Sequence, residues 1–186
     1  MRRTDLELLA IELDVLWADH GPHGRATRDG VLARGGSPLT IEEGPSFLVP
    51  PGTSFATDAR LVHAGTPAAD ALRPLRPGNW EEDEWADLLA GALGPCSLAL
   101  LDGRVVSICH TPRPLTALGA EAGVWTDPSF RGRGLAAATT ASWAGLLAPT
   151  GRHLFYSTSA SNRSSQRVAA RLGLRPLGTL VSLLRT

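Results

Sequence analysis

Six consecutive residues, Arg131–Ala136, have the composition of a turn that binds phosphate groups. Gly132 and Gly134 allow a tight backbone turn and let a ligand approach without an intervening side chain. The helix expected after them would offer unpaired N–H groups and the positive end of its dipole. Arg131 and Arg133 carry guanidinium groups that can bind phosphate oxygens in a fork. The loop therefore favours a pyrophosphate ligand over the alternative, an ordinary strand–turn–helix connection with exposed arginines.

Three kinds of phosphate site compete for this loop. A P-loop ends in Gly-Lys-Ser/Thr, and the chain contains no lysine. The pattern Gly132-x-Gly134-x-x-Ala137 matches the glycine fingerprint of dinucleotide-binding domains. That fingerprint needs an acidic residue about 20 positions further on, however, and residues 128–186 contain none. It also normally follows the first strand of its domain, whereas several elements precede it here. The third kind of site is an acetyl-CoA loop.

The charges of the chain are unevenly distributed although the net charge is zero. Residues 1–127 hold all eighteen acids and ten arginines, a net charge of −8, and residues 128–186 hold eight arginines and no acid, a net charge of +8. A basic half suits an anionic ligand and an acidic half suits a cationic one. Attraction between the two halves is the alternative explanation. The length of 186 residues allows one compact domain, alone or with an appended subdomain.

The elements expected around the loop form a mixed-sheet α/β domain. Asp102-Gly103 is a type I′ hairpin signal between two apolar runs. A strand leads into the loop, a helix ended by Pro149 follows it, and a second helix begins at the cap residue Asn162 and ends at Gly173. The expected strands span Ser97–Leu101, Arg104–His110, Glu121–Thr126, His153–Thr158 and Leu177–Leu184, and the expected helices end at about Leu147 and Leu172.

The hairpin would also position the two cysteines of the chain. If the turn sets the register, Cys96 faces Cys109 in a non-hydrogen-bonded pair, the closer kind. Two cysteines are too few for a disulfide framework, and reduced core thiols are expected in a cytosol.

The first half of the chain is less regularly patterned. Thr4 or Asp5 can cap an amphipathic helix whose leucines, ending with Leu16, lie at helical spacing. We expect short strands, a proline-containing loop that could mark a subdomain boundary, and a helix capped by Asn79 with acids in its first turn. The strands are expected over Ser46–Val49 and Arg60–His63, the loop over Thr66–Gly78, and the helix over Trp80–Leu93.

The start of the chain, Met1-Arg2-Arg3, resembles the beginning of a signal peptide, but acidic residues from Asp5 onward interrupt any apolar segment. No apolar run reaches membrane-spanning length. We therefore expect a cytoplasmic protein without a membrane partner. His20 and His23 lie three residues apart without a nearby cysteine, so no metal site is expected. No interleaving of aromatic and basic residues suggests nucleic-acid binding.

Two segments carry a resemblance to a known family. The first segment resembles the central motif of the GNAT superfamily of N-acetyltransferases, which is a hydrophobic strand, a proline turn and Arg/Gln-x-x-Gly-x-Gly/Ala. Its residues are Val124-Trp125-Thr126-Asp127-Pro128-Ser129-Phe130-Arg131-Gly132-Arg133-Gly134-Leu135-Ala136. Asn162-x-x-Ser165 followed by Arg167-Val168-Ala169-Ala170-Arg171-Leu172-Gly173-Leu174 is similar to the Asn…Leu-Gly-Phe helix of that family. The resemblance covers about residues 96–180 and looks like a branch with a divergent N-terminal half.

The resemblance implies a GNAT-like fold with splayed central strands. It divides the chain into a divergent N-terminal subdomain packed on the core, residues 1–78, and an acetyl-CoA-binding core, residues 79–186. The main chain of Val124 and Thr126 would pair with the pantetheine arm, and Asn162 would approach that arm. The pyrophosphate would be held by Arg131 and by the amides of Gly132, Arg133, Gly134, Leu135 and Ala136. Acetyl-CoA would be the co-substrate, no metal would be needed, and a homodimer would be ordinary for the family.

The implied reaction moves an acetyl group to a primary amine of a small molecule or a peptide. An ammonium group must first lose a proton, and Glu121, at the start of the coenzyme strand, is the candidate base. The alternative is that Glu121 is only a charged residue at the end of a strand, which faces solvent or pairs with an arginine. His110 is the best histidine as an auxiliary base. Many family members protonate the leaving thiolate with a tyrosine seven residues after the asparagine, where this chain has Ala169.

Two other residues are candidates for that acid role, although each has a plainer interpretation. Ser165 could donate a hydrogen bond, but a serine at a helix start more often supports the cap. Tyr156 could donate too, but it is more often a packed aromatic. A non-catalytic acyl-CoA-binding or regulatory module is therefore the alternative to an acetyltransferase, and a dinucleotide-binding oxidoreductase domain is a third hypothesis. The acidic N-terminal part mildly favours a cationic acceptor.

Overall fold

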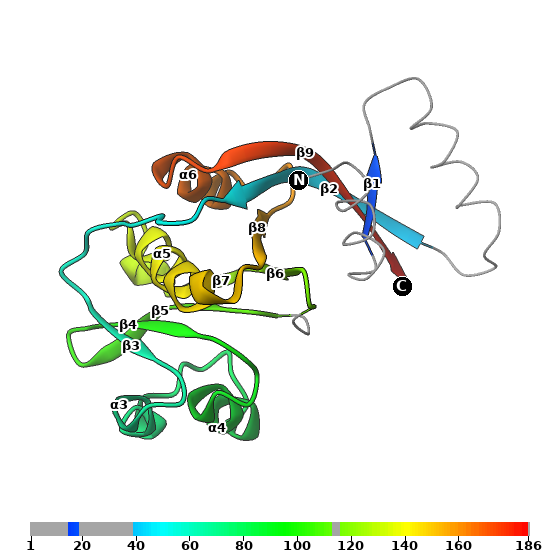
Figure 1. The fold of residues 1–186 in the computed structure, drawn as a ribbon. Helices are drawn as coiled ribbons and strands as arrows, with labels where there is room; N and C mark the ends of the chain where they lie inside the picture. The colour runs from blue at the N-terminus through cyan, green and yellow to red at the C-terminus, as the bar shows by residue number, and fades with distance from the viewer. Residues whose placement is uncertain (1–14, 19–38, 113–115, 186) are drawn as a thin grey trace.

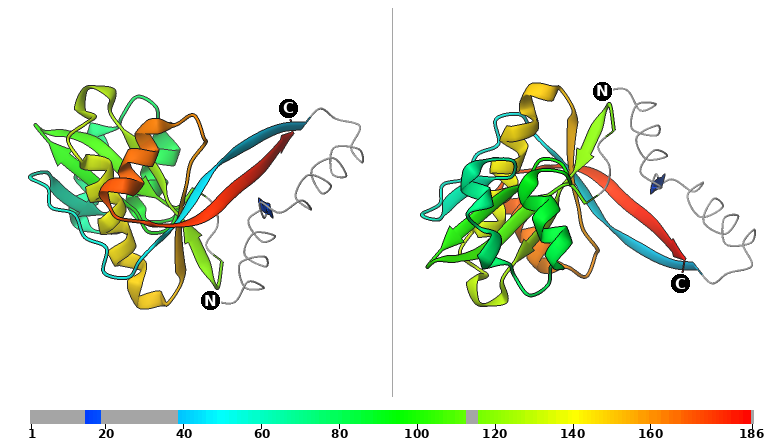
Figure 2. Two further views of the ribbon diagram at one scale, coloured as in Figure 1. Left: turned by 90° about the horizontal axis from the view of Figure 1, so that it is seen from above. Right: turned by 90° about the horizontal axis from the view of Figure 1, so that it is seen from below.

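The computed structural model describes residues 15–18, 39–112 and 116–185 of the chain, and Figures 1 and 2 show its arrangement. The strands span Val15–Ala18 (β1), Leu39–Val49 (β2), Arg60–His63 (β3), Ser97–Leu101 (β4), Arg104–His110 (β5), Gly119–Glu121 (β6), Gly123–Thr126 (β7), His153–Ser157 (β8) and Arg175–Arg185 (β9). The helices span Pro67–Asp70 (α3), Glu82–Ala90 (α4), Leu135–Leu147 (α5) and Arg163–Arg171 (α6). The strands form two sheets, ordered β1-β9-β2-β8-β6 and β3-β4-β5-β7. This mixed α/β architecture confirms the expected fold class.

The four-stranded sheet lies between helices on both faces (Figure 1). Helices α3 and α4 cover one face, where Trp85 and Leu88 of α4 pack on Leu98 and Ile108 of the sheet. Helix α5 covers the other face, and nine of its residues are buried, including the fully buried Trp143. An alanine-rich helix with little polar surface suits this position because close packing needs small, apolar side chains.

The hairpin between β4 and β5 has the expected bounds and the expected turn. Asp102 and Gly103 have φ angles of 50° and 71°, as a type I′ turn requires. The predicted cysteine pair is wrong, however. A β-bulge next to Ala99 and Leu100 shifts the register, so that Ser97, and not Cys96, lies opposite Cys109.

Both thiols are buried and free. Burial raises the pKa of Cys96 to about 12 and the pKa of Cys109 well above its usual value, so both thiols stay protonated at neutral pH.

Helix α4 is shorter than expected. It is preceded by Glu81 at the cap position instead of Asn79, and the amide of Trp80 donates to the carbonyl of Pro77 in a turn before the helix. Gly91, with a φ of 80°, ends the helix. Three acids do lie in its first turn, as expected.

The loop expected over Thr66–Gly78 contains helical turns, so that prediction was wrong. Helix α3 and a 3₁₀ turn over Arg73–Leu75 both lie within it. Each has a proline among its first two residues, where the missing N–H costs nothing. The hydroxyl of Thr66 accepts the amide of Ala69 and caps α3.

Strands β2 and β9 are longer than the predicted Ser46–Val49 and Leu177–Leu184, because they pair with each other along ten positions. Beyond β8 they continue as a ribbon that projects from the body of the molecule (Figure 2). Strand β2 also pairs with β8, and β3 pairs with β4, so strands before residue 79 bond directly to strands after it.

Part of the N-terminal prediction can be compared with the structure. Leu16, expected in the opening helix, lies in strand β1, which pairs with β9. The rest of that helix, residues 4–14, and the stretch from His20 to Gly24 lie outside the described residues. Within the described part of the chain, no helix has both the length and the apolar character needed to cross a membrane.

Candidate functional site

The two sheets separate at Ala122, between β6 and β7. The expected strand Glu121–Thr126 is therefore two strands. Strand β6 runs parallel to β8, and the amide of Ala122 donates to the carbonyl of Phe155 at 2.9 Å as the last bond on that side. From Gly123 onward the chain pairs with β5 instead. Strand β7 thus becomes the edge of its sheet, and an edge strand can pair with an extended ligand.

The connection from β7 to α5 is held by a compact turn. The side chain of Asp127 accepts the amide of Ser129 and forms an ion pair with Arg104, both at 2.9 Å. The ring of Phe130 is buried, and the guanidinium carbons of Arg104 and Arg133 lie 5.3 and 5.2 Å from its centroid. These contacts fix where the glycine-rich loop begins.

The glycines of the loop have the backbone that their sequence predicted. Gly132 and Gly134 have φ angles of 83° and 82°, in the left-handed region. Gly134 is the residue before α5, and no side chain caps the first turn of that helix. A Cβ atom on Gly134 would lie 2.7 Å from the ring of Phe55, and its residue would have to adopt a left-handed φ, so the position favours glycine. The uncapped helix start suits an anion.

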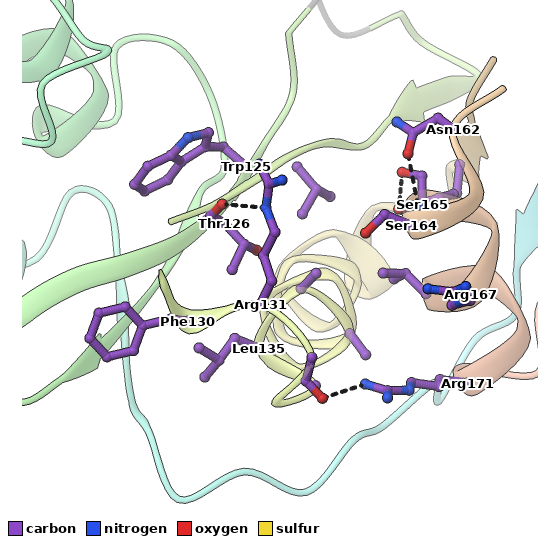
Figure 3. A pocket seen from close by; sticks show the side chains of 17 residues that line it. Trp125, Thr126, Phe130, Arg131, Leu135, Asn162, Ser164, Ser165, Arg167 and Arg171 are labelled. Atoms are coloured by element: carbon purple, nitrogen blue, oxygen red, sulfur yellow. Dashed lines mark hydrogen bonds between the residues drawn. The ribbon is translucent and has the colours of Figure 1, made fainter. Parts of the chain in front are cut away.

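A cavity of about 440 Å³ lies where β7, the loop and α6 meet (Figure 3). Trp125, Thr126 and Phe130 come from one side of it, and α6 forms the facing wall. Eight of the nine predicted coenzyme residues line it: Val124, Thr126, Arg131, Gly132, Gly134, Leu135, Ala136 and Asn162. The ninth, Arg133, is not in the lining, because its side chain packs over Phe130.

The wall formed by α6 begins with the cap that the sequence predicted. The side chain of Asn162 accepts the amide of Ser165 at 3.0 Å. The hydroxyl groups of Ser165 and Tyr156 lie 2.8 Å apart, and both residues line the cavity. Burial raises the pKa of Tyr156 to about 12, although the bond to Ser165 opposes that shift. The tyrosine hydroxyl is therefore a proton donor at neutral pH, not a base.

Two arginines of α6 line the cavity although sequence reasoning missed them. Arg167 and Arg171 are one helical turn apart and face the glycine loop. The guanidinium of Arg171 donates to the carbonyl of Gly132 at 3.3 Å. Arg131, from the loop itself, donates to the carbonyl of Thr126 at 3.3 Å. The lining thus holds three arginines and no acid, and the spacing of four along α6 was the signal that could have found two of them.

A buried hydroxyl network ties β7 to its neighbours. The hydroxyl of Ser107 donates to the carbonyl of Trp125 at 3.0 Å and lies 2.8 Å from that of Thr126. It also lies 3.3 Å from the hydroxyl of Thr139, which donates to carbonyls in the first turn of α5. Ser107 and Thr139 are fully buried, so the network fixes β7 relative to α5.

Glu121 is the predicted base that the structure does not bring into the cavity. It ends β6, opposite Phe155 of β8, and its side chain is half-buried. It is not in the lining, which begins three residues later at Val124. Among the described residues, no group of three or more His, Cys, Asp or Glu side chains could hold a metal ion.

The geometry is unlike that of a dinucleotide site. Strand β7 leads into the loop as an antiparallel edge strand, whereas the dinucleotide fingerprint follows a strand of a mostly parallel sheet.

The family model described as "acetyltransferase (GNAT) domain" matches residues 58–175. A comparison with curated proteins returned no match.

Solved structures resemble the chain over most of its length. One, described as an acetyltransferase from the GNAT family of Novosphingobium aromaticivorans, has 26% identity and a TM-score of 0.57, over 81% of this chain and 68% of that one. A GCN5-related N-acetyltransferase from Kribbella flavida has 22% identity and a TM-score of 0.57, over 87% and 63%. A GNAT acetyltransferase from Colwellia psychrerythraea has 14% identity and a TM-score of 0.59, over 86% and 62%. The last two show the fold alone, and about a third of each of these chains lies outside the match.

Proposed function

The chain belongs to the GNAT acetyltransferase family, and from that premise we propose that it binds acetyl-CoA in the cavity between β7 and α6 and transfers the acetyl group to a primary amine of a small molecule or a peptide. One observation carries the proposal: an edge strand, an uncapped helix start with two left-handed glycines and an arginine-bearing helix all face one cavity. That combination offers amides to a pyrophosphate and a strand edge to an extended arm.

The pyrophosphate would be held at the start of α5. The amides of residues 132–136 and the positive end of the helix attract anions. Arg131 and Arg171 line the same space and can form charge-assisted bonds with phosphate oxygens. Arg133 would contribute only its amide, since its guanidinium packs over Phe130. The absence of acids from the lining removes the repulsion that an anion would otherwise meet.

The pantetheine arm would extend along the free edge of β7. Val124 and Thr126 supply main-chain groups there, and Asn162 faces them from α6. The carbonyl of Thr126 now accepts a bond from Arg131. That carbonyl can accept a second bond from the arm, so Arg131 would lie beside the arm and within the same cavity as the pyrophosphate.

The amine must be neutral when it attacks. In the balanced reaction its nitrogen bonds to the thioester carbonyl carbon and the C–S bond breaks. The ammonium form of the amine gives up two protons, one taken by a base before the attack and one that ends on the coenzyme thiol. Glu121 remains the base proposed from the sequence, and because it lies outside the cavity lining it would act through water.

The departing thiolate would take its proton from the Tyr156–Ser165 pair. The two hydroxyls are 2.8 Å apart and face the cavity. Ala169, at the position of the usual tyrosine, is buried in the core and offers no polar atom. The strand residue Tyr156 would thus replace the missing helix tyrosine. The acceptor is proposed to be cationic, because the acids of the chain all precede residue 128.

The presence of Ala169 where the family usually has a tyrosine favours a second candidate function, a module that binds acyl-CoA without catalysis. A thiol-release assay with acetyl-CoA and n-butylamine, spermidine and a dipeptide with a free amino group separates the two functions. We expect thiol release that depends on at least one amine and mass-spectrometric detection of the acetylated product. Tight binding of acetyl-CoA without amine-dependent release would favour the module.

A further inference from the structure

His110 ends β5 beside the point where the two sheets separate. It pairs with Gly123, the first residue of β7, immediately after Ala122 makes the last bond to β8. A Cβ atom on Gly123 would lie 3.2 Å from Nε2 of His110 and 2.9 Å from Pro112. The imidazole nitrogen therefore lies close to the first residue of β7, where a side chain would crowd both His110 and Pro112.

The side chain lies on the α4 face of the sheet. Ile108, two residues earlier on β5, packs in the cluster formed with α4, whereas Cys109 belongs to the cluster on the α5 face. The ring of Trp80, just before α4, meets the imidazole edge-on with centroids 5.3 Å apart. Trp80 is itself buried and packs on Trp85, so the imidazole is held by a fixed aromatic neighbour.

The proposed function places the reacting end of the coenzyme next to this imidazole. The pyrophosphate site follows Thr126 in the chain, so an arm that extends back along β7 moves toward Gly123. Val124 and Tyr156 line the coenzyme cavity and belong to the core cluster on the α5 face. With the coenzyme on that side, the amine would approach the thioester from the α4 face, where His110 lies.

The surroundings of His110 favour its neutral form. Burial lowers its pKa, and the charge of Glu84 on α4 opposes that shift without cancelling it. Glu84 is the charged group that acts on it among the described residues, and its partner Gly123 on β7 carries no charge. A neutral imidazole at pH 7 has a free lone pair and can take a proton.

We propose that His110, in place of Glu121, is the catalytic base of the transfer, taking the proton of the acceptor ammonium on Nε2 before the nitrogen attacks the thioester. The neutral amine then forms the C–N bond, the C–S bond breaks, and the proton on the imidazole returns to solvent before the next turnover. Glu84 is a positioning residue, whose charge sets the pH at which the imidazole becomes available. This inference rests on the proposed function and adds a residue that the coenzyme cavity does not contain.

The test compares pH profiles of kcat for the wild-type protein, H110Q and E84Q, with the most active amine of the panel as acceptor. H110Q should lower kcat by roughly 100-fold, the lower range of general-base catalysis, with the affinity for acetyl-CoA unchanged. In the wild type, kcat falls as the pH drops through the pKa of His110. E84Q should move that fall to lower pH, because it removes the charge that raises the pKa of His110.

The matched control is H63Q. His63 lies on the α5 face, where its Nε2 is 2.9 Å from the hydroxyl of Ser142, and glutamine can keep that bond. H63Q should leave the profile unchanged. If H110Q lowers the melting temperature, its loss of kcat could come from unfolding, and the pH profile of E84Q then tests the role of His110. An unshifted profile for E84Q, or a wild-type kcat for H110Q, overturns the role of His110 while the proposed function stands. A wild-type protein that transfers acetyl to no amine overturns both.

Discussion

The two faces of β7 differ in how they are built. On the coenzyme face, the cavity is formed mainly by two segments, residues 124–137 and 162–171, with Tyr156 of β8 between them in the chain. On the α4 face, His110 comes from β5, whereas Trp80 and Glu84 come from the turn before α4 and the start of that helix, so His110 meets them only in the folded chain. The first face carries arginines without acids in its lining, and the second lies beside a helix with three acids in its first turn.

This difference explains why the sequence indicates the coenzyme but not the acceptor. A pyrophosphate is bound by backbone amides, and an amide site needs a glycine pattern and a helix start that can be recognised locally. An acceptor is bound by side chains that no local pattern brings together. The opposite charges of the two faces also suit a polyanionic coenzyme on one side and a cationic amine on the other. Three predictions test this comparison, in order of decreasing effect.

The largest effect is expected for G134V. A side chain there would meet Phe55 at 2.7 Å and adopt a φ of 82°, so the ring of Phe55 or the first turn of α5 must shift. Because several charge-assisted bonds would be lost, we expect the affinity for acetyl-CoA to fall more than about 100-fold, about 2.7 kcal/mol. Calorimetric titration measures it.

G132A is the graded control for G134V. A Cβ atom on Gly132 would have no atom within 4 Å, so only the cost of its φ of 83° remains, about 1–2 kcal/mol of stability. The affinity should stay within about tenfold of wild type. Equal losses for the two variants would contradict the packing argument at Gly134.

An intermediate effect is expected for R171A. Removing a guanidinium from the cavity should weaken acetyl-CoA about tenfold, and the loss should shrink at high salt because the site is open to solvent. R163A is the matched control, since Arg163 is on the same helix, bonds to Gln166 and is not in the lining. If R163A weakens binding as much as R171A, the effect comes from net charge alone.

The smallest effect is expected for Y156F. The variant should lower kcat by roughly three- to tenfold without changing the affinity for acetyl-CoA, because a hydrogen bond to the leaving thiolate is worth about 1 kcal/mol. Since the pKa of Tyr156 is raised to about 12, its hydroxyl stays protonated at neutral pH. Wild-type kcat should therefore show no loss from its ionisation until strongly alkaline pH. A Y156F enzyme with unchanged kcat would exclude this proton source.

Much of the coenzyme face could be predicted because its signals are local. The cap at Asn162, the glycines of the loop and the bounds of β4 and β5 follow from single residues or short patterns. Glu121–Thr126 was predicted as one strand because nothing in its sequence shows that Ala122 bonds to Phe155, more than thirty residues away.

The remaining errors have the same origin. The bulge beside Ala99 depends on how β4, β5 and α5 pack together, so the turn alone could not place Cys109 opposite Ser97. The guanidinium of Arg133, whose type suits phosphate, packs over Phe130 instead of lining the cavity, and that contact depends on the fold. Arg171 was missed because its relation to Gly132 crosses from one element to another.

The most direct test of the central claim is a calorimetric titration of acetyl-CoA into the wild-type protein, with NAD as the competing dinucleotide. The arrangement of β7, the loop and α6 predicts one acetyl-CoA site per chain, which weakens at high salt, and no measurable binding of NAD. Equal affinity for NAD, or no binding of acetyl-CoA at millimolar concentration, would contradict it.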